Sequence, residues 1–131
     1  MTEPGAGKRI LIVDDNPVVI GAAKRVLVHA GYEVETRGSV AEVDANGADG
    51  FDLILMDVVM PELYGDDVAA ILRHERGVRG RIVLYSTLDE DELKQRAAAA
   101  NVDGFINKGL GLKHLVAEVE RILGAPATGS V

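Results

Sequence analysis

The chain has 131 residues, 47% of them hydrophobic, and a net charge of -7. This length suits one compact domain, the hydrophobic fraction argues against general disorder, and the acidic balance disfavours direct nucleic-acid binding, which needs clustered Lys and Arg. The sequence has no cysteine, no apolar run of the roughly 20 residues that cross a bilayer, and no apolar secretory signal in residues 1–8, so we expect a cytoplasmic protein without disulfides or membrane association.

Apolar runs and helical periodicities alternate along the chain. In order they predict a strand at 10–13, a helix at 19–30, an edge strand at 32–36, a short helix at 40–46, a strand at 53–56, a helix at 68–77, a strand at 82–85, a helix at 93–100, a strand at 105–106 and a helix at 112–123. The strand runs are nearly continuous in apolar residues, which is typical of strands buried on both faces of a parallel sheet.

Strict alternation of strands and helices predicts an α/β fold with helices on both faces of a parallel sheet. Five such units are too few for an eight-fold barrel and fit a flavodoxin-like, doubly wound (βα)5 arrangement with strand order 2-1-3-4-5. We expect the domain to span residues 8–124, with flexible ends at 1–7 and 125–131.

Polar residues stand where the predicted strands end. Asp14 and Asp15 follow the first strand, Asp57 follows the third, and Ser86 and Lys108 end the fourth and fifth. The carboxyl ends of parallel strands share one edge, and strands one and three are neighbours in the predicted order, so the carboxylates should meet in one cleft. Three carboxylates with room for water suit Mg²⁺.

This group of residues also fits phosphoryl transfer, which needs positioning and charge stabilisation. Lys108 supplies a fixed cation, the Ser86 hydroxyl can donate to a phosphoryl oxygen, and a carboxylate such as Asp57 can form an aspartyl phosphate. A single Asp after a strand is more often a helix cap or turn residue. The prediction therefore depends on all five residues sharing one edge.

Four segments of the chain resemble the receiver domain of bacterial two-component response regulators. They are Ile-Leu-Ile-Val-Asp-Asp-Asn at 10–16, Asp-Leu-Ile-Leu-Met-Asp-Val-Val-Met-Pro at 52–61 with Gly65, Ser86, and Phe-Ile-Asn-Lys at 105–108. The resemblance covers residues 8–123. It implies a phosphoacceptor signalling domain whose chemistry is limited to its own phosphorylation and autodephosphorylation, and therefore no enzyme in the usual sense.

The resemblance also implies roles for single residues. Asp57 would be the phosphoacceptor, Asp15 a direct Mg²⁺ ligand, Asp14 a ligand acting mostly through bound water, and Val59 a ligand through its backbone carbonyl. Ser86 would sense the phosphoryl group, Lys108 would bind its oxygen, and Phe105 would be the aromatic residue that turns inward on switching.

Partners follow from the same resemblance. The donor would be a phosphohistidine on a sensor histidine kinase or phosphotransfer protein, and a downstream protein would bind the face made by the fourth helix, fifth strand and fifth helix. A homodimer is compatible with the sequence.

The sequence departs from the family pattern near the acceptor site. Gly109 follows Lys108 where Pro, often after a cis bond, is usual, and we expect a trans bond here. Thr87 stands where a small residue is usual, and its bulk should narrow access to Asp57. Val59 and Leu88, each two residues past a pocket residue, are apolar at positions that influence phosphate loss, which predicts slow autodephosphorylation.

Alternative functions remain open from the sequence. A degenerate receiver would act as a phosphorylation-independent interaction module. A small aspartyl-phosphate phosphatase would need a second Asp where Val59 stands, and Gly5 to Lys8 resembles a phosphate loop only faintly. Tyr85 interrupts an aliphatic strand beside Ser86, and we expect its ring to be partly buried.

Overall fold

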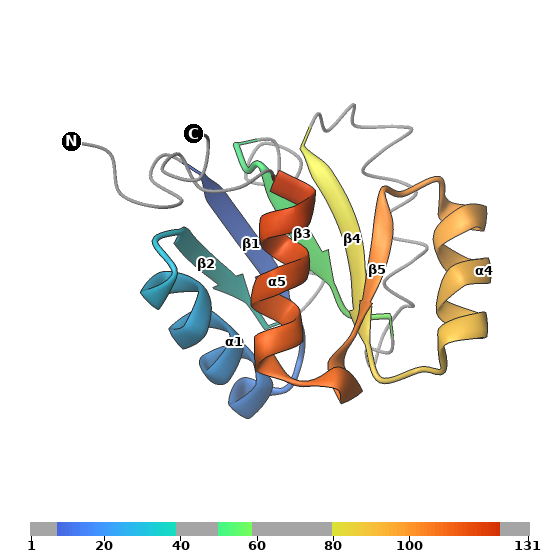
Figure 1. Ribbon diagram of the computed structural model, residues 1–131, viewed down its shortest axis with the longest axis horizontal. Coiled ribbons are helices and arrows are strands. Elements are labelled where there is room, and N and C mark those ends of the chain that lie inside the picture. Colours follow the sequence, from blue (N-terminus) through green and yellow to red (C-terminus); the bar gives the residue numbers. More distant parts are fainter. Residues whose placement is uncertain (1–7, 39–49, 59–79, 124–131) are drawn as a thin grey trace.

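The computed structural model describes residues 8–38, 50–58 and 80–123 (Figure 1). Its centre is a five-stranded sheet in the order β2-β1-β3-β4-β5, and every neighbouring pair is parallel. The strands are β1 (Arg9–Val13), β2 (Glu33–Arg37), β3 (Leu53–Met56), β4 (Arg81–Ser86) and β5 (Gly104–Asn107). The predicted strand order is confirmed, and the helices expected at 40–46 and 68–77 lie outside the described residues.

Helix α1 (Pro17–His29) begins where the sequence supplies strong start signals. The Asn16 side chain caps it by accepting from the backbone N–H groups of Val18 and Val19, and Pro17 occupies the first turn. The helix gives way to Gly31, whose φ of 104° lies in the left-handed region that glycine adopts without strain.

Two further helices and a short turn complete the described structure. Helix α4 (Glu90–Ala100) is capped by Asp89, which accepts from the N–H of Glu92, and the acidic residues of its first turn complement the helix dipole. A 3₁₀ turn, η2 (Lys108–Leu110), follows β5 directly and leads into α5 (Leu112–Leu123).

Alternate residues of each strand face opposite sides of the sheet, and in β1, β3 and β4 both sides are buried. One cluster joins Ile10, Leu53 and Val83 to α1 and α5, while the other joins Leu11, Ile54 and Ile82 to α4 and includes its Leu93 and Ala97. Helices therefore cover both faces, with α1 and α5 on one of them (Figure 1). Burial on both faces explains why β3 and most of β1 and β4 are apolar, whereas the edge strands β2 and β5 carry polar residues.

The second strand begins one residue later than the sequence pattern indicates. Tyr32 donates its N–H to the carbonyl of Leu27 and so completes the end of α1, whereas the N–H of Glu33 bonds to the carbonyl of Lys8 beside β1.

Within the described ranges, no helix is both long and apolar enough to cross a membrane.

Candidate functional site

The register of the central strands brings the predicted acidic residues together. Val13 pairs with Met56, so Asp14 and Asp57 follow the ends of adjacent strands. The ladder continues one step, because the N–H of Asp57 donates to the carbonyl of Val13 at 2.9 Å. On the other side, the N–H of Asp14 donates to the carbonyl of Arg37 at 3.1 Å. Both carboxylates are therefore placed by rigid sheet backbone.

Three carboxylates meet at this edge. One ligand oxygen each from Asp14, Asp15 and Asp57 can be chosen so that all lie within 4.8 Å of one another. Asp14 and Asp57 are buried, at 1% and 7% exposure, whereas Asp15 is open to solvent. Carboxylate oxygens on a half-open edge form a donor set that fits a hard cation of the size of Mg²⁺ and leaves room for its water ligands.

Lys108 provides the positive charge of the site. Its ammonium forms a short ion pair with Oδ2 of Asp14 and lies 3.6 Å from Oδ1 of Asp57. The Lys108 side chain is 12% exposed, so these pairs are screened less by water and salt than surface pairs are. One cation thus contacts both buried carboxylates, which would otherwise repel each other.

Ser86 ends β4 in a buried position, with 2% of its surface exposed. Its Oγ accepts from the N–H of Leu88 at 3.3 Å, which ties the hydroxyl to the loop after the strand. Thr87 is exposed and Leu88 is half-buried, while Val59 lies outside the described residues. Phe105, the predicted switch residue, is half-buried and packs against the core cluster on the α4 side of the sheet, as does Leu88.

The sequence interpretation missed how the Lys108 turn is held. Oδ1 of Asn107 accepts from the N–H of Gly109 at 2.7 Å and caps η2, while its Nδ2 lies 3.5 Å from the carbonyl of Leu88. The Lys108–Gly109 bond is trans, as expected. Asn-x-Gly is a turn signature of the kind that could have predicted this cap.

Tyr85 is more deeply buried than its sequence position indicated, with 3% of its surface exposed. Burial raises the pKa of Tyr85 to about 12, and the negative charge of Asp14 adds to the rise. The ammonium of Lys108 lies 5.3 Å from the centroid of the Tyr85 ring, within the range of a cation–π contact.

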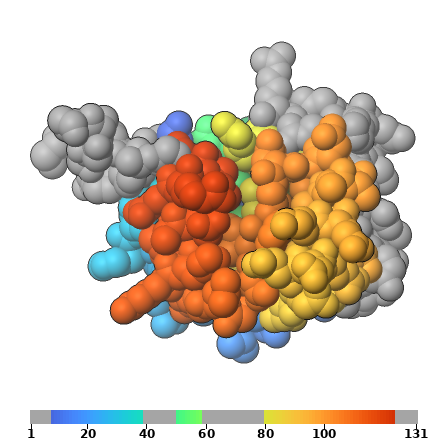
Figure 2. Space-filling view, turned by 45° about the vertical axis from the view of Figure 1, so that its right-hand side comes forward, coloured from blue at the N-terminus to red at the C-terminus, as the bar shows by residue number. Residues whose placement is uncertain are grey.

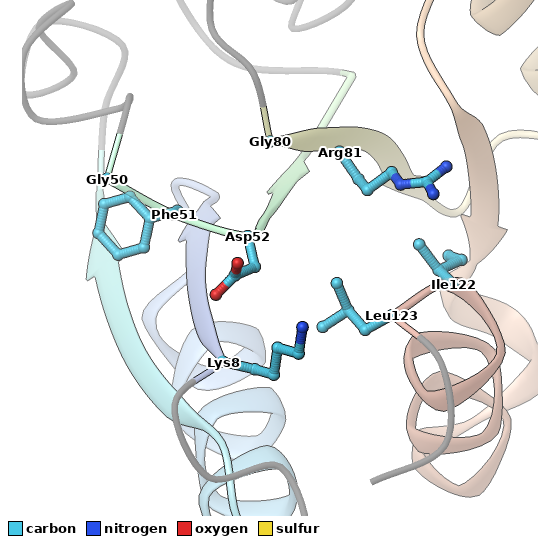
Figure 3. A pocket seen from close by; sticks show the side chains of 8 residues that line it. All are labelled: Lys8, Gly50, Phe51, Asp52, Gly80, Arg81, Ile122 and Leu123. Carbon is cyan, nitrogen blue, oxygen red and sulfur yellow. The ribbon is translucent and has the colours of Figure 1, made fainter. Parts of the chain in front are cut away.

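A polar cavity of about 430 Å³ lies at the opposite edge of the sheet (Figure 3). Lys8 and Asp52 directly precede β1 and β3, and Arg81 begins β4, so the cavity that they line lies at the amino ends of the strands. Asp52 accepts from the N–H of Arg9 at 2.7 Å, which gives this carboxylate a structural task at the start of β1. The cavity therefore does not belong to the Asp57 site.

Known proteins are similar to this chain in sequence and in fold. The sequence profile of the response regulator receiver domain matches residues 10–120. The chain is 34% identical to the nisin biosynthesis regulatory protein NisR of Lactococcus lactis, over 86% of this chain but 48% of NisR, and 28% identical to the chemotaxis protein CheY of Treponema pallidum, over 91% of this chain and 85% of CheY. The solved structure of the Vibrio cholerae chemotaxis protein CheY4 matches with a TM-score of 0.78 at 28% identity, covering 89% of this chain and 99% of that one.

The chain thus spans about half the length of NisR and most of the length of CheY. Because the family profile covers most of the chain and the sheet order agrees with the matched fold, the chain belongs to the response regulator receiver domain family, a family of phosphoacceptor signalling domains.

Proposed function

We propose that Asp57 accepts a phosphoryl group, in a Mg²⁺-dependent reaction, from a phosphohistidine on a sensor histidine kinase or phosphotransfer protein in the cytoplasm. The observation that carries this proposal is the meeting of three carboxylates beside one buried lysine at the carboxyl edge of the sheet. Membership of the receiver family supports it, because the phosphoacceptor role belongs to that family.

In the transfer, a carboxylate oxygen of Asp57 forms a bond to phosphorus while the bond between phosphorus and the donor imidazole nitrogen breaks. The nitrogen keeps the electron pair of the broken bond, so the imidazole leaves as a neutral ring once it holds a proton. Lys108, 3.6 Å from Asp57, would contact a phosphoryl oxygen and stabilise its charge. The Ser86 hydroxyl, whose oxygen accepts from the N–H of Leu88, would donate its own proton to a second phosphoryl oxygen.

The donor set suggests a division of labour among the acidic residues. A bound Mg²⁺ would neutralise carboxylate charge and offer open positions to phosphoryl oxygens. Asp15, which is exposed, would bind the ion directly together with Asp57 and the Val59 carbonyl. Asp14 is buried and paired with Lys108, which supports a role mostly through bound water.

The residues around the acceptor support a long-lived phosphorylated state. Leu88 is apolar and half-buried, and Thr87, which follows the buried Ser86, is exposed. We expect apolar Val59 and Leu88 to impede an attacking water, and Thr87 to narrow its access. If so, Val59→Asn or Leu88→Glu shortens the half-life of phosphorylated protein, measured after removal of the phosphodonor. An unchanged half-life in both variants would count against this role.

The output surface would be the face formed by α4, β5 and α5. A hollow of about 260 Å³ lies on this face, and its lining includes Glu90 of α4, Phe105 of β5 and Arg121 of α5. Figure 2 brings this face forward, with α5 in red beside α4 in gold. Because Phe105 is half-buried beneath this hollow, its inward movement would reshape the surface that a downstream protein contacts.

Beryllofluoride with Mg²⁺ tests the proposal directly, since it imitates a phosphoryl group on a carboxylate. We expect it to shift the amide NMR resonances of Ser86, Phe105 and Lys108 in the wild-type protein. Asp57→Asn is the matched control, because it keeps the size of the side chain and removes its charge. A wild-type protein that does not respond would instead support a degenerate receiver acting as a phosphorylation-independent interaction module.

A further inference from the structure

The side chain of Lys108 has more freedom than its proposed task allows. Lysine has four rotatable side-chain bonds and loses conformational entropy when it is fixed. Its backbone lies in the η2 turn, and Gly109 follows it without the fixed φ of a proline. The ion pairs with Asp14 and Asp57 attract the ammonium from one side, and a contact on another side would restrict it further.

The ring of Tyr85 lies where it can hold this ammonium. Tyr85 is the second-last residue of β4, pairs with Ile106 of β5, and is packed in the cluster beneath α1 and α5. Its ring is buried among core side chains, with 3% of the surface of the residue exposed. The Lys108 ammonium lies 5.3 Å from the ring centroid and also contacts Asp14 and Asp57.

We propose that Tyr85 is a positioning residue, whose buried ring holds the Lys108 ammonium beside Asp57 before the phosphoryl group arrives. The inference rests on the proposed role of Lys108 as the ligand of a phosphoryl oxygen. A cation over the face of an aromatic ring is attracted by the ring quadrupole, and the attraction grows when the cation is withdrawn from water. The low exposure of the Lys108 side chain, 12%, meets that condition.

The position of the contact distinguishes it from ordinary core packing. The neighbouring strand residues that face the same side, such as Leu55 and Val83, are aliphatic and fully buried. An aliphatic residue at 85 would fill the same layer and leave the ammonium without a partner on that side. The carboxylates of Asp14 and Asp57 attract the Lys108 ammonium, and the Tyr85 ring limits the positions that this ammonium can occupy.

Two substitutions separate the ring from its hydroxyl. Tyr85→Leu removes the aromatic face, whereas Tyr85→Phe keeps it. With saturating Mg²⁺, we expect beryllofluoride to bind Tyr85→Leu about fivefold more weakly than wild type, corresponding to about 1 kcal/mol, and to bind Tyr85→Phe within about twofold of wild type. Equal affinity in Tyr85→Leu, or equal losses in both variants, would overturn the proposal.

Mg²⁺ affinity measured without beryllofluoride separates positioning from general damage to the site. A loosened Lys108 competes less with the cation, so Tyr85→Leu should bind Mg²⁺ as tightly as wild type or more tightly. A parallel loss of Mg²⁺ affinity would mean that the ring merely supports the fold. In a Lys108→Met background, Tyr85→Leu should cause no further loss of beryllofluoride affinity, and a persistent fivefold loss would overturn the proposal.

A direct readout does not depend on the phosphoryl chemistry. The Tyr85 ring current should shift the ε-methylene proton resonances of Lys108 upfield. This shift should be kept in Tyr85→Phe and lost in Tyr85→Leu. If the leucine variant does not fold, Tyr85→Met replaces it, and the shift should be lost there too. Unshifted Lys108 resonances in the wild type would overturn the contact itself. A wild type that shows the shift but binds no beryllofluoride would instead disprove the proposed function.

Discussion

Replacing Gly109 with proline tests how the turn that carries Lys108 is held. The N–H of Gly109 donates to Oδ1 of Asn107 at 2.7 Å, and proline has no N–H to donate. Proline also disfavours helical backbone in the residue before it, yet Lys108 lies in the 3₁₀ turn. The residue that is usual in the family is therefore expected to be harmful in this chain.

The size of the effect follows from these contributions. Loss of the hydrogen bond costs about 1 kcal/mol, and moving Lys108 out of the turn costs about 1 kcal/mol more on the scale of local backbone strain. Proline restricts the unfolded chain and returns about 0.7 kcal/mol. We expect a net loss of about 1 kcal/mol in the free energy of unfolding, or about 4 °C in Tm for a domain of this size.

Gly109→Ala is the matched control, because it keeps the N–H. Its Cβ would lie 3.0 Å from Oδ1 of Asn107, a tight contact that the proline ring would share. Thermal and urea unfolding should rank Gly109→Pro below Gly109→Ala, and the difference should shrink in an Asn107→Ala background, where the acceptor is missing. A proline variant as stable as the alanine variant would refute this account of the turn.

Three further predictions follow from single contacts. Lys108→Met should weaken beryllofluoride binding and tighten Mg²⁺ binding. The scale of each effect is about 1 kcal/mol, the Coulomb energy in a water-like medium of the Lys108 charge 3.6 Å from Asp57, and calorimetry would detect the opposite signs. Asp89→Ala should cost about 1 kcal/mol in urea unfolding by removing the α4 cap, while Asp89→Asn should cost little. The pKa of Tyr85 is raised from 10.0 to about 12, so the folded state holds this proton more tightly than the unfolded state does. The resulting contribution to the free energy of unfolding is complete below pH 10 and is lost as pH rises to 12, and Tyr85→Phe should flatten that decline.

The fold was predictable because its strands carry a strong signal. Burial on both faces forces continuous aliphatic runs, and the pattern at 53–56 matches β3 residue for residue. The ends of other strands were less visible, because β4 begins at Arg81 and ends at Ser86, polar residues that still belong to the ladder. Hydrogen bonding, which defines a strand end, leaves little trace in hydrophobicity.

The acidic residues of the site were predictable for a different reason. The carboxyl ends of parallel strands lie at one edge of the sheet. Residues that directly follow these strands, such as Asp14, Asp57 and Lys108, are therefore expected to lie close together. The contacts of Asn107 and Tyr85 with the Lys108 turn were not predictable in the same way. They depend on the direction of side chains within a turn and on the packing between β4 and α5, which spacing along the sequence does not encode.

Charge balance connects the proposed metal to the proposed phosphorylation. When Asp14, Asp15 and Asp57 are ionised, three negative charges face the one positive charge of Lys108, a net charge of -2 that one divalent cation would cancel. A phosphoryl group on Asp57 replaces one carboxylate charge by about -2, which increases the net negative charge that the cation would neutralise. Phosphorylation should therefore tighten Mg²⁺ binding, and by linkage Mg²⁺ should favour the phosphorylated state by the same factor. Lys108 cannot replace the cation, because its single charge is already shared between Asp14 and Asp57.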